Sequence, residues 1–286
     1  MKWSIPAKTF LLGEYAALAG SSAMILTTTP CFEVLLSDKP GLDGIHDESP
    51  AGRWWIQQCH EGVGLQWHDP YHGRGGLGAS SAQFIGAYLA SVHVQKKTAN
   101  QQALLNAYWQ CVAEGAGLRP SGYDVLAQSL CGCVYINRQK NHCQSFSWPF
   151  QDVGFFLVHT GKKLATHHHL QAISLPSQIS ELAFIVDLAK EAMTAVDGYR
   201  MVDAVNAYHQ QLAHMNLVAE HSMQHIDLLR EQSGVLAMKG CGAMGADVLL
   251  LLVSIESQAV VRHQLLLMGL DIIATHTDLY DGTPLV

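Results

Sequence analysis

A glycine-rich segment at residues 73–82, with the sequence GRGGLGASSA, constrains this chain more than any other stretch. Glycines adopt positive φ angles and let the backbone approach a ligand closely. Successive backbone N–H groups in such a loop form an anion-binding nest, and a helix that begins at Ala79 or Ser80 adds the positive end of its dipole. The hydroxyls of Ser80 and Ser81 suit a helix cap, a phosphate contact or a magnesium ion. The segment therefore predicts a phosphate cradle, with an ordinary helix start after a flexible turn as the alternative.

The segment differs from the two best-known nucleotide loops. It is not a Walker A loop, because no Lys-Ser or Lys-Thr pair follows its last glycine, and no clean G-x-G-x-x-G with a preceding strand fits it. Any phosphate held here would be bound by backbone amides, and cationic charge would have to come from elsewhere in the chain or from a metal.

Bulk composition excludes several classes of function. The chain has 286 residues, enough for two domains, and a formal net charge of -7 from 17 basic and 24 acidic residues. No basic cluster is large enough to follow a nucleic-acid backbone. The longest apolar run, residues 248–253, is too short to cross a bilayer, and residues 2–6 do not resemble a signal peptide. Seven scattered cysteines are typical of reduced thiols. We expect a cytoplasmic protein with no nucleic-acid or membrane partner.

Hydrophobic patterning changes character near residue 150, which predicts two domains, 1–150 and 151–286. The first half predicts strands at 2–9, 31–37, 53–59, 63–68, 131–137 and 143–148, with helices at 80–94 and 101–116. The second half predicts strands at 153–159, 235–238, 247–253 and 270–275, with helices at 180–196, 201–217, 219–232 and 257–268.

Three further places carry residues suited to phosphoryl chemistry. Lys8 stands near the end of a strand, where a lysine pairs with a carboxylate or a phosphate, and Gly-Glu-Tyr follows at 13–15. Asp124 follows the Ser-Gly turn at 121–122, where it either caps a helix or acts on a substrate hydroxyl. Glu114 is either a metal-binding carboxylate or a solvated helix residue.

Two other segments have more than one interpretation. The late run at 239–247, KGCGAMGAD, is either a tight connection before a strand or a backbone that packs against the substrate. The triplet His167–His169 is better explained as a polar surface segment than as a metal site, because three adjacent side chains point in different directions. It could also help to bind an anionic substrate.

The order of these elements is more specific than any one of them. Pro-Ala-Lys at 6–8, Gly-Glu-Tyr at 13–15, Gly-Leu-Gly-Ala-Ser-Ser-Ala at 76–82, Ser-Gly-Tyr-Asp at 121–124 and the glycine-rich run at 240–247 succeed one another along the chain. Together they resemble the GHMP kinase superfamily, and the start of the chain resembles the mevalonate-pathway branch, which contains mevalonate kinase and phosphomevalonate kinase.

The resemblance implies an α+β fold of two domains. The N-terminal domain would bind ATP on a mixed sheet with a left-handed crossover, and the C-terminal domain would be ferredoxin-like with extra helices. The implied activity is ATP- and Mg²⁺-dependent phosphoryl transfer to mevalonate or phosphomevalonate. The implied partner is a small-molecule substrate, and the protein would be a monomer or a homodimer.

The same resemblance implies roles for individual residues. Asp124 corresponds to the catalytic aspartate, Lys8 to the lysine that pairs with it, and Ser80 and Glu114 to metal ligands, Glu114 one residue out of register. The implied ATP contacts are Gly75, Gly76, Leu77, Gly78, Ala79, Ser80 and Ser81. The implied substrate contacts are Lys8, Glu14, Tyr15, Ser121, Gly122, Gly242 and Ala243.

Departures from the family pattern keep two alternatives open. Ala7 and Ala79 replace a glycine and a serine, and Met244 and Ala246 stand where glycines are usual. One alternative is a related kinase for another small alcohol or sugar. The other, which Met244 motivates, is a catalytically silent homologue that binds a nucleotide.

Overall fold

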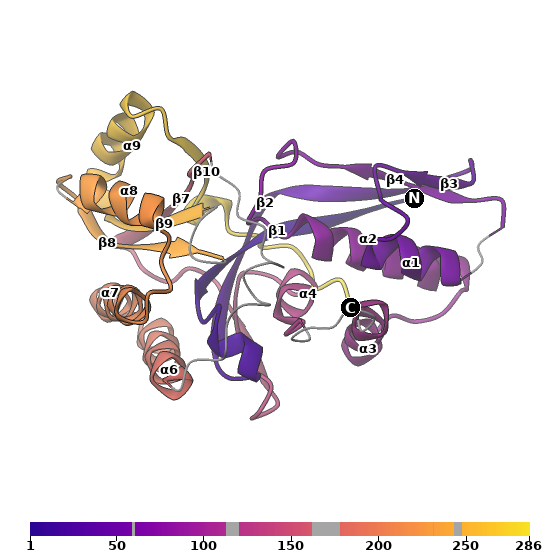
Figure 1. Cartoon of the computed structure of the whole chain (residues 1–286), viewed down its shortest axis with the longest axis horizontal. Coiled ribbons are helices and arrows are strands. Elements are labelled where there is room, and N and C mark those ends of the chain that lie inside the picture. Colours follow the sequence, from indigo (N-terminus) through magenta and orange to yellow (C-terminus); the bar gives the residue numbers. More distant parts are fainter. Residues whose placement is uncertain (59–60, 113–119, 162–177, 231, 243–247) are drawn as a thin grey trace. The chain divides into compact units, whose positions relative to one another are not determined.

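The structure, a computed structural model, describes residues 1–58, 61–112, 120–161, 178–230, 232–242 and 248–286 (Figure 1). The chain forms two compact units. Unit 1 combines Met1–Lys8, Thr27–Cys131 and Tyr280–Val286, and unit 2 combines Thr9–Leu26 and Gly132–Leu279. The first two strands each contribute residues to both units. The domain boundary near residue 150 stays a prediction.

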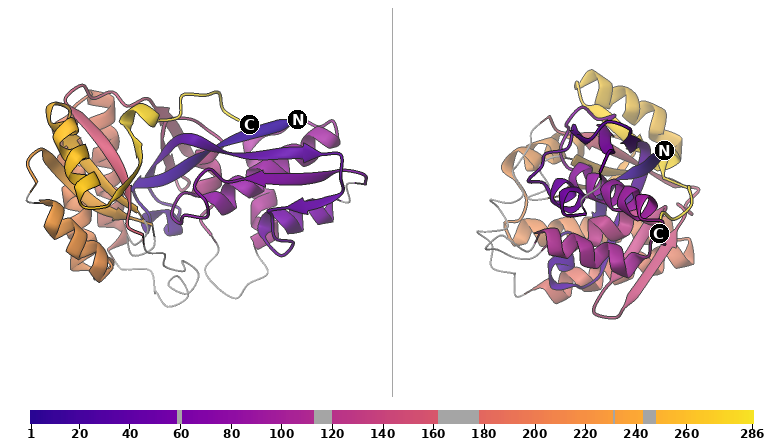
Figure 2. Two further views of the ribbon diagram at one scale, coloured as in Figure 1. Left: turned by 90° about the horizontal axis from the view of Figure 1, so that it is seen from above. Right: turned by 90° about the vertical axis from the view of Figure 1, so that its right-hand side faces the viewer.

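Unit 1 is a layer of strands with helices along one face. Its elements are the first part of β1 (Lys2–Leu12), most of β2 (Ala23–Ser37), β3 (Gly41–Asp43), α1 (Pro50–Gln57), β4 (Gly64–His68), α2 (Ala79–Val94), α3 (Gln101–Val112) and α4 (Tyr123–Gln128). Strand β2 pairs antiparallel with β4, whereas β3 runs parallel to β4, so the sheet is mixed. Helices α1 and α2 lie along one face of these strands, and α3 and α4 contact α2 (Figure 2).

Helix α1 corrects one expectation from the sequence, because residues 53–59 were predicted as a strand. The hydroxyl of Ser49 accepts a hydrogen bond from the amide of Gly52 at 3.1 Å, and Pro50 occupies the first turn. Both features favour a helix start. The apolar run Trp54–Ile56 fits a strand and a helix equally well, so the capping residues and the packing of Trp54 against α2 decide the outcome.

Unit 2 is built on an antiparallel sheet in the order β10-β7-β9-β8. Its elements after the first strands are η1 (Ala16–Ala19), β5 (Cys133–Asn137), β6 (His142–Phe146), β7 (Val153–His159), α6 (Ile179–Ala195), α7 (Gly198–His214), α8 (Glu220–Arg230), β8 (Val235–Cys241), β9 (Val248–Ser254), η3 (Ile255–Ser257), α9 (Gln258–Leu267), β10 (Asp271–Thr275) and η4 (His276–Asp278). Helices α6 to α8 follow β7, and α9 lies between β9 and β10. This is the βαββαβ plan of a ferredoxin-like domain with extra helices, as the resemblance implied.

Helices cover both faces of this sheet, α8 and α9 on one face and α6 and α7 on the other (Figure 1). Residues Val248–Val253 of β9 are all buried, which explains why this strand is an unbroken apolar run. Side chains alternate between the faces along each strand. Met238 of β8 therefore packs with Ile226 and Leu229 of α8, while its neighbour Lys239 points toward α7.

Several other expectations from patterning are confirmed. Helix α2 begins at Ala79, and the three helical patterns of the second half form α6, α7 and α8. Strand β8 extends to Cys241 instead of ending at 238, because Lys239 pairs in register with Leu250 of β9. Within the described ranges, no helix combines the length and apolar character that crossing a membrane requires.

Candidate active site

The glycine-rich loop in unit 1 lies directly against Lys8. Gly78 caps α2 with a φ angle of 81°, which L residues with a side chain rarely adopt. A Cβ atom at this position would also lie 2.6 Å from Cγ of Lys8. The backbone amide of Lys8 donates a hydrogen bond to the carbonyl of Leu77 at 3.0 Å, which joins β1 to the loop. A glycine at position 78 is thus required by both its backbone angle and its neighbour.

Lys8 and Asp124 form an ion pair, with Nζ of Lys8 3.0 Å from Oδ1 of Asp124. Strand β1 supplies the lysine, and the first turn of α4 supplies the aspartate. The lysine side chain is 10% exposed and the aspartate side chain 38% exposed. A buried cation therefore orients a carboxylate that a ligand can still reach.

The turn before α4 places Asp124. Gly122 caps the helix in the left-handed region, with φ at 77°, and Nε1 of Trp109 in α3 donates to the carbonyl of Pro120 at 3.1 Å. The hydroxyl of Ser121 accepts from the amide of Tyr123 at 3.3 Å. The short motif Ser-Gly-x-Asp is thus a turn that α3 anchors.

Helix α3 also supplies Tyr108, a further neighbour of Asp124. Burial raises the pKa of Tyr108, and the negative charge of Asp124 adds to the effect. The phenol therefore stays neutral near the carboxylate. The sequence did not single out this residue.

Gln128 of α4 connects this helix to strand β1 and to the glycine-rich loop. The sequence did not single out this residue either. Its side chain is fully buried, and its Nε2 atom donates to the carbonyls of Pro6 at 2.7 Å and Gly78 at 3.2 Å. Its Oε1 atom lies 2.5 Å from the hydroxyl of Ser81. Gln128 stands one helical turn after Asp124, so it joins α4 to both β1 and the loop. Its only sequence signal is an isolated amide in an apolar stretch.

The two serines of the loop have different environments. Ser80 is exposed at the start of α2, whereas Ser81 is buried and its hydroxyl lies 3.0 Å from the carbonyl of Gly78. Of the ATP contacts expected, Leu77 is buried with Ser81, and Gly75, Gly76, Gly78 and Ala79 are half-buried. Ser80 is therefore the serine whose hydroxyl faces solvent.

Ser80 fits a magnesium ligand, because its exposed hydroxyl stands at the helix start where phosphates would be held. Glu114, the other expected ligand, lies outside the described residues. Across the described ranges, no three His, Cys, Asp or Glu side chains gather as a metal cluster. Magnesium in kinase sites commonly takes only one or two protein ligands, since substrate phosphates and water supply the others.

Other expected substrate contacts lie in unit 2. Glu14 is paired with Lys239 of β8 at 2.8 Å, and both side chains are buried, with 6% and 0% exposed. Tyr15 is buried, and Gly242 follows β8 with φ at 84°. Ala243, Met244, Ala246 and the triplet His167–His169 lie outside the described residues. The roles of these residues stay predictions.

Lys239 was not among the site residues expected from the sequence. Burial by itself lowers the pKa of Lys239, but the acidic groups of Cys241 and Glu14 outweigh it and raise the pKa above its usual value. Its Nζ atom also lies 5.8 Å from the ring centre of Tyr208 in α7. The lysine is therefore a charged group at the centre of unit 2.

Comparison with solved structures identifies the fold. Phosphomevalonate kinase of Streptococcus pneumoniae, in complex with phosphomevalonate and AMPPNP, superposes with a TM-score of 0.79 at 14% identity, covering 96% of this chain and 99% of that one. Mevalonate kinase of L. major, in complex with R-mevalonate, gives 0.74 at 17% identity, covering 99% and 97%. Galactokinase of Lactococcus lactis, complexed with galactose, gives 0.74 at 12% identity, covering 95% and 92%.

The chain therefore has the fold of the GHMP kinases over nearly its whole length, as its motifs implied. No protein-family model matches the sequence, and no curated protein matches it. The structural neighbours act on different small molecules, so the fold does not distinguish the mevalonate branch from the others.

Proposed function

We propose that this protein is a kinase that transfers the γ-phosphoryl group of ATP to a small metabolite. The observation that carries this proposal is the ion pair between Lys8 and Asp124, at 3.0 Å, beside the left-handed Gly78 of the phosphate loop. A buried cation, an accessible carboxylate and an amide nest within one compact unit are the parts that phosphoryl transfer requires.

Each residue has a defined part in this chemistry. The amides of the glycine-rich loop and the start of α2 bind the phosphates of ATP. Asp124 orients the acceptor group, which is a hydroxyl in mevalonate and a phosphate in phosphomevalonate, and it accepts the proton that a hydroxyl acceptor loses. The acceptor oxygen bonds to the γ-phosphorus, and the bond from that phosphorus to the ADP oxygen breaks. Lys8 stabilises the negative charge on the transferring group. Magnesium, held by Ser80 and by Glu114, would neutralise charge on the phosphate oxygens when bound.

For the acceptor, we propose mevalonate or phosphomevalonate. The support is the sequence of the motifs at 6–15 and 121–124, and two of the fold neighbours are kinases of these compounds. A kinase for another small alcohol or a sugar is the second candidate, because a galactokinase shares the fold with the same TM-score, 0.74, as the mevalonate kinase of L. major.

A substrate panel tests the proposal. The purified protein would be incubated with ATP, Mg²⁺ and either mevalonate, phosphomevalonate, homoserine or galactose, and ADP release would be measured by a coupled assay. We expect turnover on mevalonate or phosphomevalonate to exceed turnover on the others. Preference for homoserine or galactose would support the second candidate. Tight ATP binding by calorimetry without ADP release on any acceptor would show a catalytically silent homologue.

Separate variants of the two loop serines distinguish metal binding from packing. We expect Ser80→Ala to raise the Mg²⁺ concentration for half-maximal activity by about tenfold or more, with unchanged stability, because its hydroxyl is exposed. Ser81→Ala should instead lower the free energy of unfolding by about 1 kcal/mol, because it removes a buried hydrogen bond. A magnesium titration and urea unfolding of both variants measure this, and the reverse pattern would exchange the two roles.

Gln128 should act as a positioning residue for the loop. We expect Gln128→Leu to lower the free energy of unfolding by about 1–3 kcal/mol, because the Pro6 and Gly78 carbonyls lose a buried donor. The KM for ATP should rise more than kcat falls, since the loop shifts while Asp124 remains. Gln83→Leu is the matched control, because Gln83 also donates to a backbone carbonyl, at 3.2 Å, but at the surface. A loss of kcat alone would contradict this role.

A further inference from the structure

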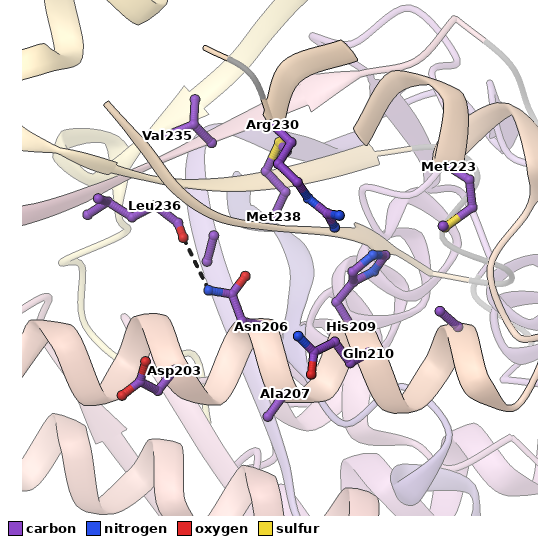
Figure 3. Close-up of a pocket in the computed structure, with 12 residues that line it drawn as sticks. Asp203, Asn206, Ala207, His209, Gln210, Met223, Arg230, Val235, Leu236 and Met238 are labelled. Atoms are coloured by element: carbon purple, nitrogen blue, oxygen red, sulfur yellow. Dashed lines mark hydrogen bonds between the residues drawn. The ribbon is translucent and has the colours of Figure 1, made fainter. Parts of the chain in front are cut away.

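A groove lies beside the edge strand β8, between α7 and α8 of unit 2 (Figure 3). Its volume is about 810 Å³, which falls within the range typical of small-molecule sites. The described residues that line it belong to unit 2, whereas Lys8 and Asp124 belong to unit 1. The described lining therefore contains neither residue of the ion pair proposed for phosphoryl transfer.

His209 of α7 lines this groove and has an unsatisfied ring nitrogen. Its side chain is 3% exposed, and its Nδ1 atom has no hydrogen-bond partner in the part of the chain that the structure describes. Burial, together with the charges of Arg230 and Lys239, lowers the pKa of His209 to about 4, although Asp227 acts in the opposite direction. The imidazole is neutral at pH 7, so a ligand that accepts a hydrogen bond from its N–H would recover the cost of burying it.

Arg230 gives the groove its positive end. It is the last residue of α8, and its guanidinium extends toward His209 (Figure 3). No carboxylate of the described residues forms a salt bridge with it. Asp203, the acidic residue in the lining, stands six positions before His209 in α7, about 9 Å away along the helix. A guanidinium that no described carboxylate pairs with is suited to the carboxylate or phosphate group of a ligand.

The wall near this positive end is apolar. Met223 of α8 and Met238 of β8 line the groove beside Arg230 and His209 (Figure 3). Methionine side chains adapt to apolar ligands of varied shape. Asn206, by contrast, already donates a hydrogen bond to the carbonyl of Leu236 at 3.1 Å, so this backbone acceptor at the edge of β8 is satisfied. The ligand that complements this lining has an anionic head and an apolar body.

We propose that this groove is a second ligand site, which binds a small amphiphilic anion. Its phosphate or carboxylate group contacts Arg230 and His209, and its apolar part packs on Met223 and Met238. This site does not depend on the proposed kinase activity, and each can fail without the other.

Calorimetry with model amphiphiles tests the site. The intact protein would be titrated with hexyl phosphate, hexanoate, inorganic phosphate and hexanol. We expect hexyl phosphate or hexanoate to bind more tightly than inorganic phosphate and hexanol, and the tighter of the two identifies the head group. Arg230→Gln should weaken that binding by about tenfold or more, because it removes charge-assisted hydrogen bonds. Arg200→Gln is the matched control, because Arg200 is an exposed arginine of α7 that does not belong to the described lining of the groove. It should change the affinity less than twofold.

A second measurement reports on the groove directly and excludes binding at another phosphate site. The imidazole resonances of His209, assigned from their loss in His209→Gln, should shift during the titration with the midpoint that calorimetry gives. Three results would overturn the proposal: equal affinity in Arg230→Gln and Arg200→Gln, binding that leaves the His209 resonances unshifted, or no binding of either amphiphile at millimolar concentration.

Discussion

Replacing Asp124 by asparagine should lower kcat by about 10²–10⁴-fold, which is the range that a positioned general base contributes. The amide keeps the shape of the side chain but cannot accept the proton of the acceptor hydroxyl. The effect on stability should be small, about 1 kcal/mol, because the carboxylate is 38% exposed and the amide oxygen of asparagine can still accept a hydrogen bond from Lys8. Steady-state kinetics on the best substrate of the panel, with urea unfolding beside it, would measure both quantities.

A pair of lysine variants on the same strand isolates the catalytic charge. Lys8→Met should lower kcat by about 10²–10³-fold, since it removes a cation from the transferring group. Lys2→Met is the matched control, because Lys2 also pairs with an acidic residue, Glu33 at 2.7 Å, but its side chain is 51% exposed. Full turnover in Asp124→Asn, or equal losses in Lys8→Met and Lys2→Met, would refute the roles assigned to this pair.

The largest loss of stability should come from the buried ion pair of Glu14 and Lys239. Lys239→Met leaves a carboxylate that is 6% exposed without its cation, 2.8 Å away in the native protein. Breaking such a pair by removing one partner costs about 3–5 kcal/mol. We therefore expect a fall of that size in the free energy of unfolding, measured by urea denaturation. Lys140→Met, whose exposed ion pair with Asp187 spans 3.4 Å, should change it by less than about 1 kcal/mol.

A double-mutant cycle and the pH dependence test the same pair. Glu14→Gln combined with Lys239→Met should be more stable than Lys239→Met alone, because no charge then remains buried. The pKa of Lys239 is raised from 10.5 by folding, so its stabilising effect is complete below pH 10.5 and declines as the pH rises further. Lys239→Met should lack that alkaline decline. Additive single effects would mean that the two charges do not interact.

The sequence predicted the helices and strands of this protein better than it predicted which side chains contact one another. The start of α2 at Ala79 and the three helices α6 to α8 follow from glycine placement and helical periodicity. The mistaken strand at 53–59 shows the limit of periodicity, because two tryptophans and an isoleucine in succession do not distinguish the two kinds of element. Ser49 and Pro50 carried the better signal for α1.

Some residues of the candidate site could not be found from pattern alone. The fully buried side chain of Gln128 binds Pro6, Gly78 and Ser81, which stand far from it in the chain. Lys239 was part of a glycine-rich run, and its complete burial depends on the pairing of β8 with β9. A polar side chain acquires such a role only when packing removes it from water, and packing depends on distant residues.

The sequence by itself determined the chemistry that this protein can present: a loop whose glycines accept left-handed angles, a serine at a helix start, a lysine and an aspartate. These properties are local, since they depend on the residue and its immediate neighbours. The family resemblance already implied that Lys8 pairs with Asp124, and the structure places their Nζ and Oδ1 atoms 3.0 Å apart. Only the tertiary structure decided that Ser80 is exposed while Ser81 is buried, and that Lys239 is paired inside unit 2. Those outcomes depend on strand register and helix packing, which bring together side chains that no local pattern relates.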